Sequence, residues 1–125
     1  KFFNEAVDGC NWMVPQKVPH DYENTYYTYA LKYYGDQKHG LSWKDFYNKY
    51  KEMGGDGFYG ACKNPYLEPA FKDLEINGRK FGPGLCPTAE EIQPRIMQFK
   101  TNYRNLDIAR GKAELLKTLI NKIGK

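Results

Sequence analysis

Tyrosine is the residue type that offers this sequence the most chemistry. The chain has 11 Tyr among its 125 residues, and most of them fall between Tyr22 and Tyr66. A tyrosine ring can stack on a sugar face or a nucleobase while its hydroxyl group makes hydrogen bonds. Lysines are interspersed with these tyrosines. Aromatic stacking beside basic groups is therefore one way in which this chain could recognise a ligand, and packing in the core is the alternative for the tyrosines.

The patterns of the common catalytic sites are missing. Gly55-Asp56-Gly57 followed by Gly60 matches part of a dinucleotide-binding motif, but no helix is expected to begin there. No serine lies in the setting of a nucleophile elbow. The acids Glu90 and Glu91 fall in the first turn of a predicted helix, where they favour the helix dipole. We expect no complete catalytic set within this chain.

Histidine and cysteine give no sign of a metal site. His20 and His39 both lie in polar stretches without the Cys or Asp spacing of metal ligands. Cys10, Cys62 and Cys86 are widely spaced and odd in number. That pattern favours three reduced thiols over a disulfide framework. We therefore expect a cytoplasmic protein with no bound metal.

Net charge and hydropathy limit the classes of binding partner that the sequence predicts. The net charge is +4 and the pI is about 8.9. Acids are interspersed with the bases, so no long cationic run indicates a nucleic-acid partner. No apolar run approaches the ~20 residues that span a bilayer, so no membrane partner is expected. The length and a hydrophobic content of 41% fit a single domain over residues 1–125.

The first half of the chain predicts two extended segments and a helix. Residues 1–11 are expected to be the end of a connecting helix. An extended segment at 12–15 follows, and the β-branched and aromatic residues of 25–34 predict a strand. Residues 35–40 are interpreted as a polar loop. Ser42 is expected to cap a helix that runs to Met53.

The second half predicts two helices. Thr88 and Glu91 fit a capping box at the start of a helix over 88–99, which Pro94 should kink. The apolar periodicity of 105–123 predicts a terminal helix.

Residues 55–87 separate these two halves and are rich in glycine and proline. We expect a short strand at 57–61 followed by ordered irregular structure. The order of elements predicts an α+β fold, with helices packed on one face of a small, mainly antiparallel sheet.

Four segments carry a resemblance to a known family. Cys86-Pro87-Thr88-Ala89-Glu90-Glu91 matches best, and Asn24–Leu31, Ser42–Met53 and Gly57–Phe71 occur in a matching order. Together they resemble the C-terminal part of the DegT/DnrJ-type sugar aminotransferases. These are pyridoxal-phosphate (PLP) enzymes. The resemblance covers the chain from about Val14 to Gly124.

The resemblance implies a small C-terminal domain of a fold-type I PLP enzyme. The full-length enzyme would use PLP to transfer an amine from an amino donor to a nucleotide-linked keto-sugar. It would be a homodimer built largely through a large domain that this sequence lacks. The Schiff-base lysine would lie in that domain. This segment alone would then bind no PLP, be inactive, and form one wall of the substrate site.

The chain departs from the family pattern in several places. Tyr59 and Tyr66 stand near the positions of two loop histidines, and Tyr27 replaces a strand histidine. Asn102-Tyr103-Arg104 spells the family's phosphate-binding tripeptide, but it follows the Ala-Glu-Glu helix, where the family does not place it. We interpret that tripeptide as the approach to the terminal helix.

The candidate substrate-binding residues are Tyr27, Tyr59, Lys63 and Tyr66. The tyrosines could stack on a sugar, and Lys63 could meet a diphosphate. The alternative is that the tyrosines pack against the aromatic stripe of the helix at 42–53, while Lys63 is solvated.

A second function of a different class stays open. The chain could be a stand-alone, Tyr-rich module that binds carbohydrate or single-stranded nucleic acid. Some relatives in the resembled family use PLP for sugar dehydration, and no residue present here separates that reaction from transamination.

Overall fold

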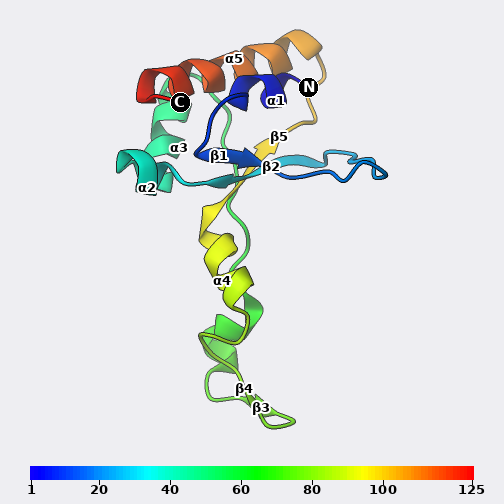
Figure 1. Ribbon diagram of the computed structural model, residues 1–125, viewed down its shortest axis with the longest axis vertical. Coiled ribbons are helices and arrows are strands. Elements are labelled where there is room, and N and C mark those ends of the chain that lie inside the picture. The colour runs from blue at the N-terminus through cyan, green and yellow to red at the C-terminus, as the bar shows by residue number, and fades with distance from the viewer.

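Three short strands form the sheet around which the rest of the chain is arranged (Figure 1). A computed structural model describes all residues 1–125. Its strands β1 (Met13–Pro15), β2 (Thr28–Tyr33) and β5 (Ile96–Lys100) are antiparallel, in the order β1-β2-β5. The expected α+β class with a small antiparallel sheet is confirmed.

Alternation along the strands gives the sheet two different faces. Tyr29, Leu31 and Tyr33 of β2 are buried, as are Met97 and Phe99 of β5. Because side chains alternate along a strand, their neighbours point to the opposite side. We call that side the open face; its residues on the paired strands are Val14, Thr28, Ala30, Lys32, Ile96, Gln98 and Lys100.

Three helices cover the other face of the sheet (Figure 1). They are α1 (Phe2–Val7), α3 (Trp43–Glu52) and α5 (Leu106–Ile123). Their apolar sides join the buried strand residues in one core, whose helical members are Phe3, Ala6, Val7, Phe46, Tyr50, Ala113, Leu116, Leu119 and Ile120. None of the helices combines the length and the apolarity that a membrane span requires.

Local signals place the ends of the two longer helices correctly. The Ser42 hydroxyl accepts a hydrogen bond from the Asp45 N–H at 3.0 Å, and the Asn105 side chain accepts one from the Asp107 N–H at 2.7 Å. Each bond satisfies an N–H group that the first turn of a helix leaves free. The helix predicted before Gly9 is also present, as α1.

One expected loop and one expected strand are wrong. Residues 35–40 are not a loop, because Gly35–His39 form the short helix α2, which ends at Gly40 in a left-handed conformation with φ 63°. Residues 57–61 are not a strand. A single bridge pairs Tyr59 with Gln98 of β5, and the glycines on both sides of it prevent a longer ladder.

The helix predicted over 88–99 is also wrong in its second half. Helix α4 spans only Pro87–Ile92, a 3-10 turn follows at Gln93–Arg95, and the chain then enters β5. Pro94 has no N–H group to continue the helix. Met97 and Phe99 gain burial by alternating in a strand, which outweighs the local helical pattern.

A long segment leaves the sheet on the side away from the three covering helices (Figure 1). We call residues 61–92 the arm. It contains 3-10 turns at Pro65–Leu67 and Pro69–Phe71, a hairpin of β3 (Glu75–Ile76) and β4 (Arg79–Lys80), and helix α4. Asn77 and Gly78 both have positive φ, as a tight hairpin turn requires. No residue of the arm is buried.

Candidate functional site

The largest of the hollows described here lies at the end of the open face where β2 begins and β5 ends. Its volume is about 1100 Å³. Residues from the start of β2, from the segment beside β5 and from the end of β5 meet there. We call it the aromatic hollow; its lining residues are Thr25, Tyr26, Tyr27, Thr28, Gly57, Tyr59, Gly60, Cys62, Gln98, Lys100, Thr101 and Asn102.

Two of the four predicted site residues, Tyr27 and Tyr59, come together in this hollow. Their exposed fractions are 92% and 71%, so neither packs in the core. Phe58 packs against the helix α3 stripe instead, with its ring centroid 4.9 Å from that of Trp43 and 5.0 Å from that of Tyr47. The packing alternative is therefore wrong for Tyr27 and Tyr59, whose rings are free to contact a ligand.

The backbone before Tyr27 is strained. Tyr26 has a φ of 48°, in the left-handed region that non-glycine residues rarely adopt. Its N–H donates to the Asn24 side chain at 2.7 Å. The Thr101 hydroxyl lies 2.7 Å from the Tyr26 carbonyl and 2.9 Å from that of Tyr27, so its single proton is shared between the two acceptors. Strain of this kind often marks a functional site, and the exposed Tyr27 follows it directly in the chain.

Gln98 organises the floor of the hollow. Its backbone exchanges two hydrogen bonds with Tyr59, at 3.1 and 2.8 Å. Its side-chain N–H₂ donates to the Gly60 carbonyl at 3.0 Å, and its side-chain oxygen accepts from the Thr28 hydroxyl at 3.3 Å. These bonds fix the Gln98 amide between Gly60 and Thr28, in the hollow that Tyr59 also lines. The floor therefore presents ordered polar groups at the base of two exposed aromatic rings.

The hollow carries a positive charge and no negative one. Lys100 is its cation, and the Lys100 ammonium also lies 5.1 Å from the centroid of the Tyr103 ring. The lining contains no Asp, Glu or Arg. PLP enzymes commonly place an Asp or Arg at the pyridine nitrogen of the cofactor. The residues of this hollow therefore do not fit PLP, whereas they do fit a neutral or anionic ligand with hydroxyl groups.

The other two predicted residues, Lys63 and Tyr66, lie in the arm and outside this hollow. The Tyr66 hydroxyl donates to the Glu90 carboxylate at 3.0 Å. Desolvation and that bond to an anion raise the pKa of Tyr66 to about 12. The Lys63 ammonium lies 3.8 Å from the Glu68 carboxylate. Grouping them with Tyr27 and Tyr59 is wrong, because the chain turns away from the sheet after residue 60.

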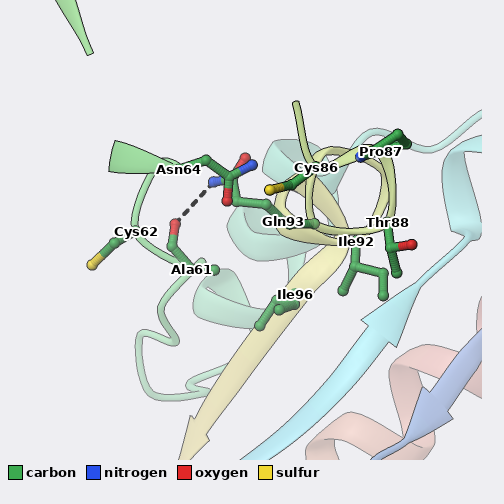
Figure 2. Close-up of a pocket in the computed structure, with 10 residues that line it drawn as sticks. Ala61, Cys62, Asn64, Cys86, Pro87, Thr88, Ile92, Gln93 and Ile96 are labelled. Atoms are coloured by element: carbon green, nitrogen blue, oxygen red, sulfur yellow. Dashed lines mark hydrogen bonds between the residues drawn. The ribbon is translucent and has the colours of Figure 1, made fainter. Parts of the chain in front are cut away.

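Figure 2 shows a second hollow, of about 510 Å³, where the arm meets β5. The Gln93 side chain donates to the Ala61 carbonyl at 3.1 Å across it. Cys62 and Cys86 line it from two separate segments of the arm, and Ile92 and Ile96 add apolar side chains (Figure 2). We call it the arm hollow. Its lining has no charged side chain, so it offers shape and apolar surface more than chemistry.

The Asn102-Tyr103-Arg104 tripeptide connects β5 to α5, as interpreted from the sequence. The Tyr103 hydroxyl donates to the Asp56 carboxylate at 2.8 Å, and the Lys112 ammonium lies 3.3 Å from that carboxylate. Partial burial raises the pKa of Asp56, but the Tyr103 bond and the Lys112 charge outweigh it, so the net shift is downward. Tyr103 thus joins the segment after α3 to the start of α5.

Sequence reasoning missed Gln98, Lys100 and Thr101. The signal was present, because polar residues alternate with Met97 and Phe99 in this segment. This alternation is typical of a strand, but the helix predicted over 88–99 included these residues.

Comparison with protein-family models, with curated proteins and with solved structures finds no match for this chain. The interpretation of function below therefore depends on the geometry of the site and on the order of the sequence motifs.

Proposed function

We propose that the aromatic hollow binds the sugar of a nucleotide-linked keto-sugar, and that this chain is the C-terminal domain of a PLP-dependent aminotransferase. The observation that carries the binding proposal is the pair of exposed rings, Tyr27 and Tyr59, beside the fixed amide of Gln98. Sugar rings offer an apolar face for stacking and hydroxyl groups for hydrogen bonds, and this hollow provides partners for both.

The order of elements supports the family part of the proposal. Strand β2, helix α3, the irregular segment after it, helix α4 beginning at Pro87, and the terminal helix α5 occur in the order that the resemblance implies, with strand β5 between α4 and α5. The proposal assigns transamination to PLP and to a lysine that this sequence does not contain. The residues of this chain contribute binding and orientation: the tyrosine rings fix the plane of the sugar, and Gln98, Thr101 and Asn102 offer polar groups to its edge.

A titration of the chain with a sugar nucleotide tests the proposal. UDP-glucose serves as the probe, with Tyr27→Ala and Tyr59→Ala as the variants. We expect each variant to weaken binding roughly tenfold, since a lost aromatic stack costs about 1 kcal/mol or more. Tyr22→Ala is the matched control, because Tyr22 is 72% exposed and lies outside the hollow. Equal losses in all three variants would contradict the proposal.

PLP itself provides a separate test of the domain assignment. The chain alone is expected to bind PLP weakly and without the visible absorbance of a lysine-linked cofactor. Tight, lysine-linked PLP binding, measured by absorbance and by mass after borohydride reduction, would show that the chemistry lies within this chain.

One observation favours the second candidate function, a stand-alone carbohydrate-binding module. Tyr27 and Tyr59 are exposed in the same hollow as the ordered Gln98 amide, an arrangement that a stand-alone module would also use to bind a sugar. That candidate predicts equal affinity for an oligosaccharide and for a sugar nucleotide. Single-stranded nucleic acid stays within this second candidate, because bases could also stack on the exposed rings of Tyr27 and Tyr59 beside Lys100.

A further inference from the structure

The β3–β4 hairpin forms the end of the arm that lies farthest from the sheet (Figure 1). Its two-residue turn is Asn77-Gly78, with a φ of 51° at Asn77 and of 73° at Gly78. Positive φ at both central positions is typical of a type I′ turn, in which Asn followed by Gly is strongly preferred. The same dipeptide is chemically reactive, because a glycine leaves the backbone nitrogen that follows the asparagine unhindered.

The side chain of Asn77 differs from those of the other asparagines in two ways. No other asparagine in this chain precedes a glycine. The side chains of Asn24 and Asn105 each accept a hydrogen bond from a backbone N–H group, at 2.7 Å in both cases. The Asn77 amide makes no hydrogen bond within the chain and is exposed, so it is free to turn toward the backbone.

The nitrogen that follows Asn77 is free as well. The Gly78 N–H group makes no backbone hydrogen bond, and a Cβ added at Gly78 would meet no atom within 4 Å. Asn102 offers the contrast, because the next N–H group, that of Tyr103, donates to the Thr101 carbonyl at 2.9 Å. The turn of the hairpin thus combines a free amide, a free nitrogen and open access for water.

This combination suits an attack of the backbone on the Asn77 amide. The Gly78 nitrogen loses its proton and forms a bond to Cγ of Asn77. The Cγ–Nδ2 bond breaks, and Nδ2 leaves with that proton as ammonia. Water then opens the five-membered succinimide ring. Its addition at Cγ gives aspartate, and its addition at the backbone carbonyl carbon gives isoaspartate, whose main chain runs through the former side chain. Water is the only co-reactant, and nothing is oxidised or reduced.

We propose that Asn77 is a site of spontaneous deamidation, and that the isoaspartate product opens the β3–β4 hairpin while the helix-covered core stays folded. Isoaspartate adds a methylene group to the main chain of a turn that has two residues, and turn length sets the register of a hairpin. Only two pairs hold these strands together, Glu75 with Lys80 and Ile76 with Arg79. This modification does not depend on the proposed function.

The consequences of opening the hairpin should stay within the arm. The Phe81 N–H group donates to the Leu74 carbonyl at 2.9 Å, and the Phe81 ring stacks on Phe71. Both contacts depend on the register of the hairpin. Because no residue of the arm is buried, their loss removes little apolar burial and leaves the core intact.

The experiment incubates the 125-residue chain at neutral and at mildly alkaline pH and follows each asparagine by peptide mass spectrometry. Asn77 should lose its amide roughly tenfold faster than Asn102, because Asn102 is followed by a residue with a side chain and a bonded N–H group. The rate should rise with pH, since the Gly78 nitrogen must lose its proton. Methylation by a protein-isoaspartate methyltransferase detects the isoaspartate product.

Asn77→Gly is the matched control, because Gly-Gly also fits a type I′ turn but carries no amide. Unchanged circular dichroism confirms that this variant folds. In the aged chain the Phe81 amide should exchange its hydrogen roughly tenfold faster, while the buried amides of α3 and α5 keep their rates. The aged Asn77→Gly chain should keep the Phe81 amide protected.

Three results would overturn this inference: deamidation of Asn77 no faster than that of Asn102, aspartate as the sole product, or equal loss of Phe81 protection in aged Asn77→Gly. None of these measurements involves a sugar, so failure here is distinguishable from failure of the sugar-binding proposal.

Discussion

In the helix-covered part of the molecule, Phe46, Phe58 and Phe99 are almost completely excluded from water, whereas no residue of the arm is buried. The arm has aromatic residues too, but Phe71 and Phe81 stack on one another at its surface, 6.1 Å apart. Burial of apolar area therefore stabilises the first region, and it contributes little to the second. The two regions should respond to different substitutions.

The arm has no buried core, and the carboxylate of Glu90 connects several of its segments by hydrogen bonds. The Glu90 side chain accepts hydrogen bonds from the Gly84 N–H at 2.9 and 3.0 Å, from the Cys86 N–H at 3.2 Å and from the Tyr66 hydroxyl. It thereby joins the base of helix α4 to the loop before it and to the first 3-10 turn. Segments ordered in this way open locally at lower free energy than a packed core.

The largest effect is expected from removing a ring in the core. Phe58 contacts the rings of Trp43, Tyr47 and Phe99. Phe58→Ala should lower the free energy of unfolding by about 3–5 kcal/mol, since it removes a buried ring and leaves a cavity. Phe71→Ala in the arm is the matched control and should cost less than about 1 kcal/mol. Urea denaturation measures both, and equal losses would mean that the arm shares the core.

The next effect should be confined to the arm. Glu90→Gln keeps the shape of the side chain but removes its charge, so the Gly84 and Cys86 N–H groups lose a charged acceptor. Hydrogen exchange at these two amides should accelerate roughly tenfold while the global unfolding midpoint stays unchanged. Glu91→Gln is the control, because the Glu91 carboxylate forms an ion pair with Arg95, at 3.5 Å, and accepts no bond from the Gly84 or Cys86 N–H groups. A large drop in the global midpoint would refute the separation of the two regions.

Acid should reproduce that effect in the unmodified chain. The N–H groups of Gly84 and Cys86, together with Tyr66, lower the pKa of Glu90 below its ordinary value of 4.5. A lowered folded-state pKa gives stability that is complete above the unfolded pKa and is lost as the pH falls through the folded one. Protection of the Gly84 amide should therefore be lost as the pH falls below 4.5 and through the lowered pKa of Glu90, while the core amides stay protected. Equal loss in both regions on acidification would count against this assignment.

Local chemistry made part of the fold predictable. The caps at Ser42 and Asn105 depend on neighbours two or three residues away, and the sequence contains that information. Strand β5 depends on β2, which lies some 70 residues earlier in the chain, so its five residues could not be separated from the helix before them. Pairing with a distant segment therefore determines that β5 is a strand.

The same dependence on non-local pairing explains which residues of the candidate site could be predicted from the sequence. Tyr27 and Tyr59 were found by residue type, but Gln98 and Thr101 reach the site only through the pairing of β5. Lys63 and Tyr66 were grouped with Tyr59 because they are close in sequence. The arm then carries them to a different environment, where Tyr66 bonds Glu90. Proximity in sequence is a poor guide where the chain leaves a sheet.

The smallest predicted effect distinguishes two tyrosines within the core. Burial raises the pKa of Tyr29 and of Tyr50 well above the ordinary value, so both hydroxyls are neutral. The Tyr50 hydroxyl donates to the Lys112 carbonyl at 2.9 Å, whereas the buried Tyr29 hydroxyl has no partner. Tyr50→Phe should therefore lower the free energy of unfolding by about 1 kcal/mol. Tyr29→Phe should increase the free energy of unfolding, by a similar or smaller amount. Thermal unfolding of the two variants checks the signs, and a loss in Tyr29→Phe would show that its hydroxyl bonds an internal water.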